Sequence, residues 1–172
     1  MKIRRALLIG MLSLVALIVI LHSSVSVPAN HVGVVTLFGR PQLRTLDNGF
    51  HLVNPLAVVT KINLQLREYT LPRIAASTAD GHRISVECTA WYRVDPNQVV
   101  KLFLDLGSYY EDTVVRPAIQ VSARKVIAMH TLQEFNGGDR ALIEQKIYES
   151  LRGLLAEKYL LLDRTFIQDS RS

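Results

Sequence analysis

The chain has 172 residues, of which 49% are hydrophobic and 20% are charged, and its formal net charge is +5 at pH 7. Three of these positive charges, Lys2, Arg4 and Arg5, precede the first apolar run, and from Pro28 onward 17 basic residues face 15 acidic ones. Such a mixed surface lacks the basic stripe that nucleic-acid binding requires, so no nucleic-acid partner is expected. The single cysteine, Cys88, excludes an internal disulfide framework.

An uninterrupted apolar run from Ala6 to Leu21 follows the basic start. A helix needs about 20 residues to cross the hydrocarbon core of a bilayer, and the run reaches this length when residues 22–25 are added in the headgroup zone. We therefore predict a helical membrane anchor over residues 1–27. The residues expected to line the anchor are Ala6, Leu7, Leu8, Ile9, Leu12, Val15, Leu17, Ile18, Ile20 and Leu21.

The charges around the apolar run predict its orientation. No basic residue follows the run until Arg40, so the positive-inside rule places the N-terminus in the cytoplasm and the rest of the single-pass chain outside it. The expected location is the periplasmic side of a bacterial inner membrane, or an equivalent compartment. The alternative is a cleaved secretory signal that ends at Val27-Pro28-Ala29, which would release a secreted soluble binding domain.

About 145 residues remain beyond the anchor, enough for one domain over residues 28–169 with a short tail over 170–172. Runs of β-branched and alternating residues between turn signals predict strands in this domain. The predicted strands cover residues 31–38, 50–53, 61–69 and 83–94, with a final strand over 160–167.

The strand over residues 83–94 has the longest alternation in the chain, which predicts an antiparallel sheet with one buried face. Its expected inward set is Ile84, Val86, Cys88, Ala90, Tyr92 and Val94. Cys88 is therefore interpreted as a small core residue and not as a reactive thiol. Trp91 falls on the opposite face, where a helix, a neighbouring protomer or the membrane surface should cover its ring, and cover from within the chain is favoured.

A helical period replaces the alternation after Asp95-Pro96, a predicted N-cap and first turn. The first predicted helix presents Val99, Val100, Phe103 and Leu104 on one face and ends at Gly107.

Ser108 is the predicted cap of a second helix, in which Pro117 belongs to the first turns or marks a bend. The residues assigned to this helix are Glu111, Val115, Ile119, Val126 and Met129. A third helix is predicted from Asp139 to Tyr159, with an apolar stripe formed by Ile143, Ile147, Leu151, Leu154 and Leu155. Strands followed by helices and a last strand indicate the α+β class.

No motif for catalysis, cofactor binding or metal binding is present in the sequence. The five histidines are scattered, and each is more typical of a surface or hydrogen-bonded histidine than of a ligand. Glu111 and Asp112 at a helix start are explained by the helix dipole. We therefore expect no enzyme activity, no catalytic residues, no cofactor and no metal. An extracytoplasmic hydrolase is a weak alternative, because no nucleophile–base pair can be named.

Several segments, in order, resemble the SPFH/Band 7 domain of prohibitins, stomatins and flotillins. The segments that carry the resemblance are Gly33-Val34-Val35, Phe38-Gly39-Arg40, Gly49-Phe50-His51 to Pro55, Thr78-Ala79-Asp80-Gly81 with ISVECTAWYRVDP, and VVRPAIQVSARKVIAMHTLQEF followed by residues 140–159. The resemblance covers residues 27–169 and is nearest to the bacterial HflC/HflK and prohibitin branch, whose members carry a single N-terminal anchor and an exported domain.

This resemblance implies a membrane scaffold that oligomerises and organises membrane proteins or lipid microdomains. The implied partners are membrane lipids, further copies of the chain or prohibitin-like paralogues, and an AAA-type membrane protease that the scaffold modulates. The family continues from this domain into a long coiled-coil helix. Residues 168–172 stand where that helix would begin, and one apolar stripe is too short for sustained heptads, so we expect the C-terminal coiled coil to be absent and the oligomers to be small and weak.

Overall fold

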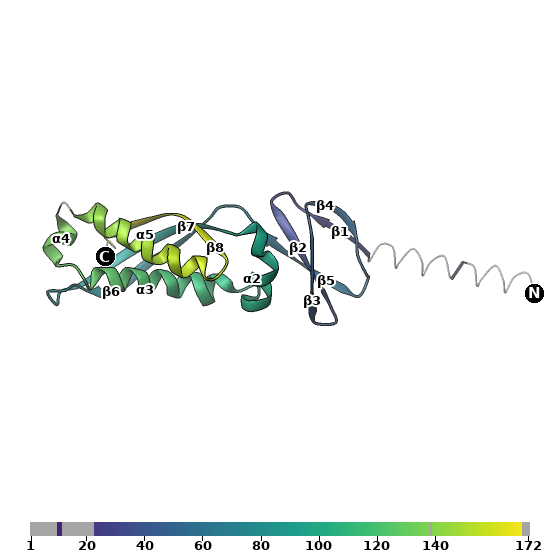
Figure 1. Cartoon of the computed structure of the whole chain (residues 1–172), viewed down its shortest axis with the longest axis horizontal. Helices are drawn as coiled ribbons and strands as arrows, with labels where there is room; N and C mark the ends of the chain where they lie inside the picture. The colour runs from purple at the N-terminus through teal and green to yellow at the C-terminus, as the bar shows by residue number, and fades with distance from the viewer. Residues whose placement is uncertain (1–9, 12–22, 138, 170–172) are drawn as a thin grey trace, which may run out of the picture. The chain divides into compact units, whose positions relative to one another are not determined.

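The structure is a computed structural model that describes residues 10–11, 23–137 and 139–169. The chain divides into two compact units, Met1–Asn63 and Leu64–Ser172, which we call the N-terminal unit and the C-terminal unit. Antiparallel strands come first, helices follow, and one strand closes the chain (Figure 1). This order confirms the predicted α+β class.

The N-terminal unit contains two small antiparallel sheets. Its strands are β1 (Ser24–Val27), β2 (His31–Leu37), β3 (Arg40–Leu46), β4 (Gly49–Leu52) and β5 (Ala57–Asn63). β1 pairs with β4, while β2 lies between β3 and β5. Val34 and Ile62 are buried in the core of this unit. The strands predicted near residues 31–38 and 50–53 are thus confirmed, whereas the sequence analysis did not predict β1 or β3.

A two-residue turn joins β2 to β3. Phe38 and Gly39 both have positive φ angles, 49° and 77°, as a type I′ hairpin turn requires. Phe38 therefore belongs to the turn, although the sequence predicted it as the last residue of a strand. Pro41 is accommodated directly after the turn because β3 is at the edge of its sheet, where a missing N–H costs no ladder hydrogen bond.

The predicted strand over residues 61–69 is wrong, because two strands meet there. β5 ends at Asn63 and β6 (Arg67–Ser77) begins four residues later, on either side of the boundary between the two units. Leu66 shares a face with the buried Ile62 in the alternating pattern, yet it has 43% of its surface exposed. The alternation of apolar and polar residues continues across this boundary. It therefore could not show that the two strands join different sheets.

The C-terminal unit is built on a three-stranded antiparallel sheet in which β7 (Arg83–Val94) lies between β6 and β8 (Leu160–Asp169). The predicted inward set of β7 is confirmed from Val86 to Val94, with each member at most 1% exposed, and Ile84 is only half-buried. On the opposite face the guanidinium of Arg164 on β8 lies 5.8 Å from the ring centre of Trp91. A neighbouring strand of the same chain thus gives Trp91 part of its expected cover.

Helical segments cover the inward face of this sheet. They are the 3-10 helix η1 (Pro96–Gln98), α2 (Val99–Leu106), the π-helix η2 (Glu111–Val115), α3 (Arg116–Ile127), α4 (Leu132–Asn136) and α5 (Arg140–Ala156). α3 packs against β6 and α5 against β8, and the two helices contact each other (Figure 1). The predicted α5 stripe is confirmed, with only Leu154 half-buried.

At the start of the helical region, the structure confirms the predicted N-cap but not the whole predicted buried face. Asp95 accepts a hydrogen bond from the Asn97 N–H at 2.9 Å, as an N-cap does. Leu104, predicted for the inner face of α2, is 47% exposed, and Leu102 is buried instead. The predicted α2 face was therefore only partly correct: Val99 is buried as expected, but the buried face is rotated towards Leu102, because eight residues define a helical face poorly.

The second predicted helix differs from the structure at both ends. The helical hydrogen bonds begin in η2 with Tyr110, not Ser108, at the N-cap position, and α3 ends at Ile127, so Met129 lies beyond it and is 62% exposed. α4 was not predicted, although Thr131 and Glu134 form its capping box.

Candidate functional site

Side chains that could take part in catalysis or bind a metal are the first candidates for a functional site. Within the described residues, no group of three His, Cys, Asp or Glu lies close enough together to hold a metal ion. Cys88 is fully buried, and burial raises the pKa of its thiol to about 12. Because the thiolate is the nucleophilic form, Cys88 is unreactive at neutral pH. This confirms its interpretation as a core residue.

His130 is a hydrogen-bonded structural residue. It is 8% exposed, its Nδ1–H donates to the Glu134 carboxylate at 3.2 Å, and its Nε2 accepts from the Lys146 ammonium at 3.2 Å. The Glu134 carboxylate also accepts the Thr131 backbone N–H at 2.8 Å. These bonds connect the end of α3 to α4 and α5, and they satisfy both ring nitrogens.

A second polar cluster fixes the π-helix η2 to the sheet. The Tyr92 hydroxyl on β7 donates to the Glu111 carboxylate at 2.7 Å, and Arg67 on β6 forms an ion pair with the same carboxylate. Burial raises the pKa of Tyr92, and its hydrogen bond to Glu111 raises it further. Glu111 therefore holds β6, β7 and η2 together. The helix-dipole interpretation missed this role because Tyr92 and Arg67 are far from Glu111 in the sequence.

The ten residues predicted to line the anchor lie outside the residues that the structure describes, which within the run from Ala6 to Leu21 are Gly10 and Met11 alone. The last four residues of the range predicted for the anchor, Ser24 to Val27, form β1. None of the helices in the described part of the chain has both the length and the apolar character needed to cross a membrane.

Exposed large apolar side chains occur in both units, and five in the N-terminal unit lie in β4, β5 and the turns after β2 and β4. These five have 64–78% of their surface exposed, and we call this set the apolar rim. Its members are Phe38, Phe50, Leu52, Leu56 and Val58. Exposed apolar patches of this kind mark surfaces that contact a membrane or another protein. The rim is the candidate functional surface of the chain.

Strand pairing places the rim beside the end of the N-terminal apolar run. The Ser23 carbonyl accepts the Val53 N–H at 2.8 Å, and Ser24 on β1 lies opposite Leu52 on β4. Leu56 follows Val53 by three residues, in the turn that leads to β5. At the start of β5, Ala57 pairs with Leu37, the residue that precedes Phe38. Phe50 and Leu52, with Leu56 in the turn that follows, are thus the members of the rim nearest to Ser23, whereas Phe38 and Val58 belong to the paired strands β2 and β5 and the turn after β2.

Sequence reasoning missed the rim for a specific reason. Phe50 and Leu52 were assigned to the predicted strand over residues 50–53, and Leu56 was given no role. Their crowding within a few residues of Pro55, with no alternation beyond β4, was the available signal. Only strand pairing shows that these side chains remain exposed.

The model of the SPFH domain / Band 7 family matches residues 25–171, from the second residue of β1 to a point beyond the end of β8. No curated protein matches the chain significantly.

Proposed function

Because this chain belongs to the SPFH domain / Band 7 family, a family of membrane-associated scaffolds, we propose that it is a membrane-anchored scaffold that oligomerises and organises membrane proteins or lipid microdomains. Residues 6–21 form the anchor, the N-terminus is cytoplasmic, and the strands of the N-terminal unit stand outside the cytoplasm together with the C-terminal unit. The position of the apolar rim beside Ser23 is the observation that carries this proposal.

The rim adds a second attachment to the anchor. A chain whose apolar run ends at a bilayer surface brings the side chains next to Ser23 to that surface. Burying one Leu or Phe side chain contributes about 1.5–3 kcal/mol. Partial insertion of Phe50, Leu52 and Leu56 into the interface therefore holds the N-terminal unit against the membrane.

The packing of β1 favours retention of the anchor over signal cleavage. Cleavage near Ala29 would remove β1, the strand that pairs with β4. It would also remove Val27, which is 2% exposed and lies within 3.3 Å of the position that a Cβ on Gly33 would take. Losing a buried valine and a paired strand destabilises the unit, so the folded N-terminal unit is better supported by an uncleaved chain.

The proposed partners follow from the family. They are membrane lipids, other copies of the chain or prohibitin-like paralogues, and an AAA-type membrane protease whose activity the scaffold modulates. No cofactor enters this proposal.

A fluorescence measurement tests the position of the rim. We place a single cysteine at Leu56 in the full chain carrying Cys88→Val, label it with an environment-sensitive dye, and reconstitute the chain in lipid vesicles. Leu56→Cys should give blue-shifted emission that lipid-borne nitroxides quench. Lys61→Cys is the matched control, because it is exposed in the same unit about 16 Å further along β5 at about 3.3 Å per residue. Equal emission from both positions would refute the membrane-facing rim.

A further inference from the structure

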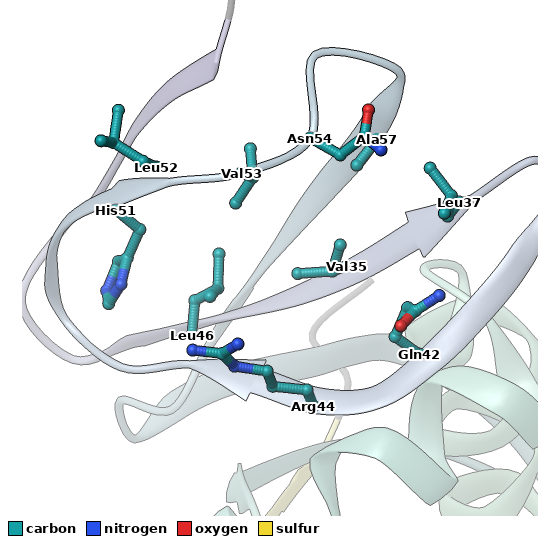
Figure 2. Close-up of a pocket in the computed structure, with 10 residues that line it drawn as sticks. All are labelled: Val35, Leu37, Gln42, Arg44, Leu46, His51, Leu52, Val53, Asn54 and Ala57. Atoms are coloured by element: carbon teal, nitrogen blue, oxygen red, sulfur yellow. The ribbon is translucent and has the colours of Figure 1, made fainter.

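The N-terminal unit contains a pocket of about 230 Å³ between its two sheets (Figure 2). Strands β2, β3 and β5 and the segment from β4 to the following turn supply its lining. The aliphatic part of the lining consists of Val35, Leu37, Leu46, Leu52, Val53 and Ala57. The polar part consists of Gln42, Arg44, His51 and Asn54. An apolar wall with a few polar groups is typical of a small-molecule site.

Arg44 is the cationic group of this lining. Its side chain is exposed, and no ion pair joins it to any residue in the described part of the chain. Figure 2 shows the Arg44 side chain extending from β3 past Leu46, towards the side of the pocket on which His51 lies. Residues 23–63 contain three basic residues and one acidic residue, Asp47. The unit therefore favours an anion at this position.

The remaining polar groups are already oriented. The His51 Nε2–H donates to the Asp47 carbonyl at 2.7 Å, because a carbonyl oxygen can only accept. Asn54 accepts the Leu56 N–H at 2.9 Å. Both bonds fix the turns around the pocket without using the Arg44 guanidinium, which is left to bind a ligand.

We propose that this pocket binds an anionic amphiphile, in which Arg44 contacts the oxygens of a phosphate or carboxylate head and the aliphatic wall contacts the first methylenes. A guanidinium matches such oxygens with two parallel hydrogen bonds. The inference rests on the proposed membrane attachment and adds the chemistry of the lipid that the N-terminal unit selects.

The size and position of the pocket favour a lipid over a free anion. About 230 Å³ is less than the roughly 300 Å³ at which sites for whole drug-sized ligands begin, so only the head-proximal part of an acyl chain fits. Leu52 both lines the pocket and has 70% of its surface exposed beside Ser24. The rest of the chain can leave along Leu52 towards the bilayer, whereas inorganic phosphate would use Arg44 and leave the aliphatic wall uncovered.

Ligand-induced thermal stabilisation of the full chain in a non-ionic detergent tests the proposal. The probes are lysophosphatidylglycerol, which is anionic and amphiphilic, lysophosphatidylcholine, which is zwitterionic, and inorganic phosphate, which has no chain. We expect a saturable rise in Tm with lysophosphatidylglycerol alone. Arg44→Gln should weaken this apparent affinity roughly tenfold, as the loss of a charge-assisted hydrogen bond does. Lys61→Gln removes one positive charge from the same unit outside the pocket and should leave the affinity unchanged.

Four outcomes would overturn the proposal. Equal stabilisation by lysophosphatidylcholine would show that charge is not recognised, and stabilisation by phosphate alone would show an anion site without a lipid. Equal loss in Arg44→Gln and Lys61→Gln would show non-specific attraction. If the Leu56 label reports a membrane environment while the Tm does not respond to lysophosphatidylglycerol, this inference fails and the membrane-anchored scaffold stands. If the label stays in water, the membrane attachment itself fails.

Discussion

Single side chains in the C-terminal unit join segments that are distant in the sequence. Asp80, in the turn between β6 and β7, accepts hydrogen bonds from the Thr78 hydroxyl and from the backbone N–H of Leu132 at 3.2 Å. The first of these bonds, helped by the second, lowers the pKa of Asp80 from its usual 3.8. The sequence predicted the turn at Asp80-Gly81, but it could not predict a bond to a helix 52 residues away.

The lowered pKa of Asp80 gives a pH-dependent contribution to stability. A carboxylate whose folded pKa is below its unfolded pKa stabilises the fold fully above the unfolded pKa, and this contribution is lost as the pH falls through the folded pKa. Asp80→Asn should therefore lower the urea midpoint at neutral pH, and the difference from the parent chain should shrink at about pH 3, below the usual aspartate pKa. The exposed Asp112→Asn is the control. An undiminished difference in acid would contradict the linkage.

Two neighbouring positions on the inward face of β7 should respond very differently to substitution. Cys88 and Val86 are both fully buried. Cys88→Val replaces one small apolar side chain by another and should change the free energy of unfolding by less than about 1.5 kcal/mol. Val86→Asp buries an unpaired carboxylate, which costs several kcal/mol, and should unfold the C-terminal unit. Thermal melts of both variants measure this, and an unchanged melt for Val86→Asp would mean that the faces of β7 are reversed.

At the scale of elements, long and regular patterns predicted the structure well. Twelve alternating residues predicted β7, and the apolar stripe from Ile143 to Leu155 predicted α5, because each pattern repeats its period several times. Elements with a short or interrupted pattern were not predicted correctly: β1 and β3 were missed, and β5 was merged with β6, whose register shifts between Leu71 and Ile74. In the candidate site, the apolar residues of the rim can be read from the sequence, but their exposure cannot. Exposure depends on which strands pair, and the alternation within one strand does not determine that pairing.

The π-helix η2 shows how side chains stabilise an irregular element. Tyr92→Phe removes the hydroxyl that donates to Glu111 while the ion pair with Arg67 remains. Because a buried hydrogen bond to a charged group contributes about 1.5–3 kcal/mol, the free energy of unfolding should fall by about that amount. Tyr159→Phe is the matched control, since its hydroxyl donates to Asp105 at 2.6 Å on an exposed surface, where water replaces the bond. Equal losses in urea unfolding would show that η2 is not held by this contact.

At the scale of the whole molecule, the order of strands and helices and the family were predictable from the sequence, because both depend on the order of many weak signals along the chain. The division at Asn63 was not predicted. No composition change or flexible linker marks it, and Leu64 continues the apolar alternation of β5.

The orientation of the chain in the membrane is testable with fused reporters. Lys2, Arg4 and Arg5 precede the apolar run, so an enzyme reporter that is active only outside the cytoplasm should be active when fused after Ser172. A reporter that is active only in the cytoplasm should be inactive at the same position. The reverse result would exclude both the proposed orientation and the single-anchor assignment. Replacing Lys2, Arg4 and Arg5 by glutamine should reduce the preference between the two reporters.

The position of β8 beside β7 has a consequence for the order in which the chain folds. Val94 pairs with Leu160 and Val86 with Asp169, so the central strand of the C-terminal unit gains its second neighbour only from residues 160–169. During synthesis, β7 and the helices that follow it emerge before this neighbour exists. Contacts of such long sequence separation form slowly, and an unpaired strand edge is prone to aggregate. The nascent chain therefore passes through a stage that a chaperone at the exit site would need to protect, and this stage ends when the last strand emerges.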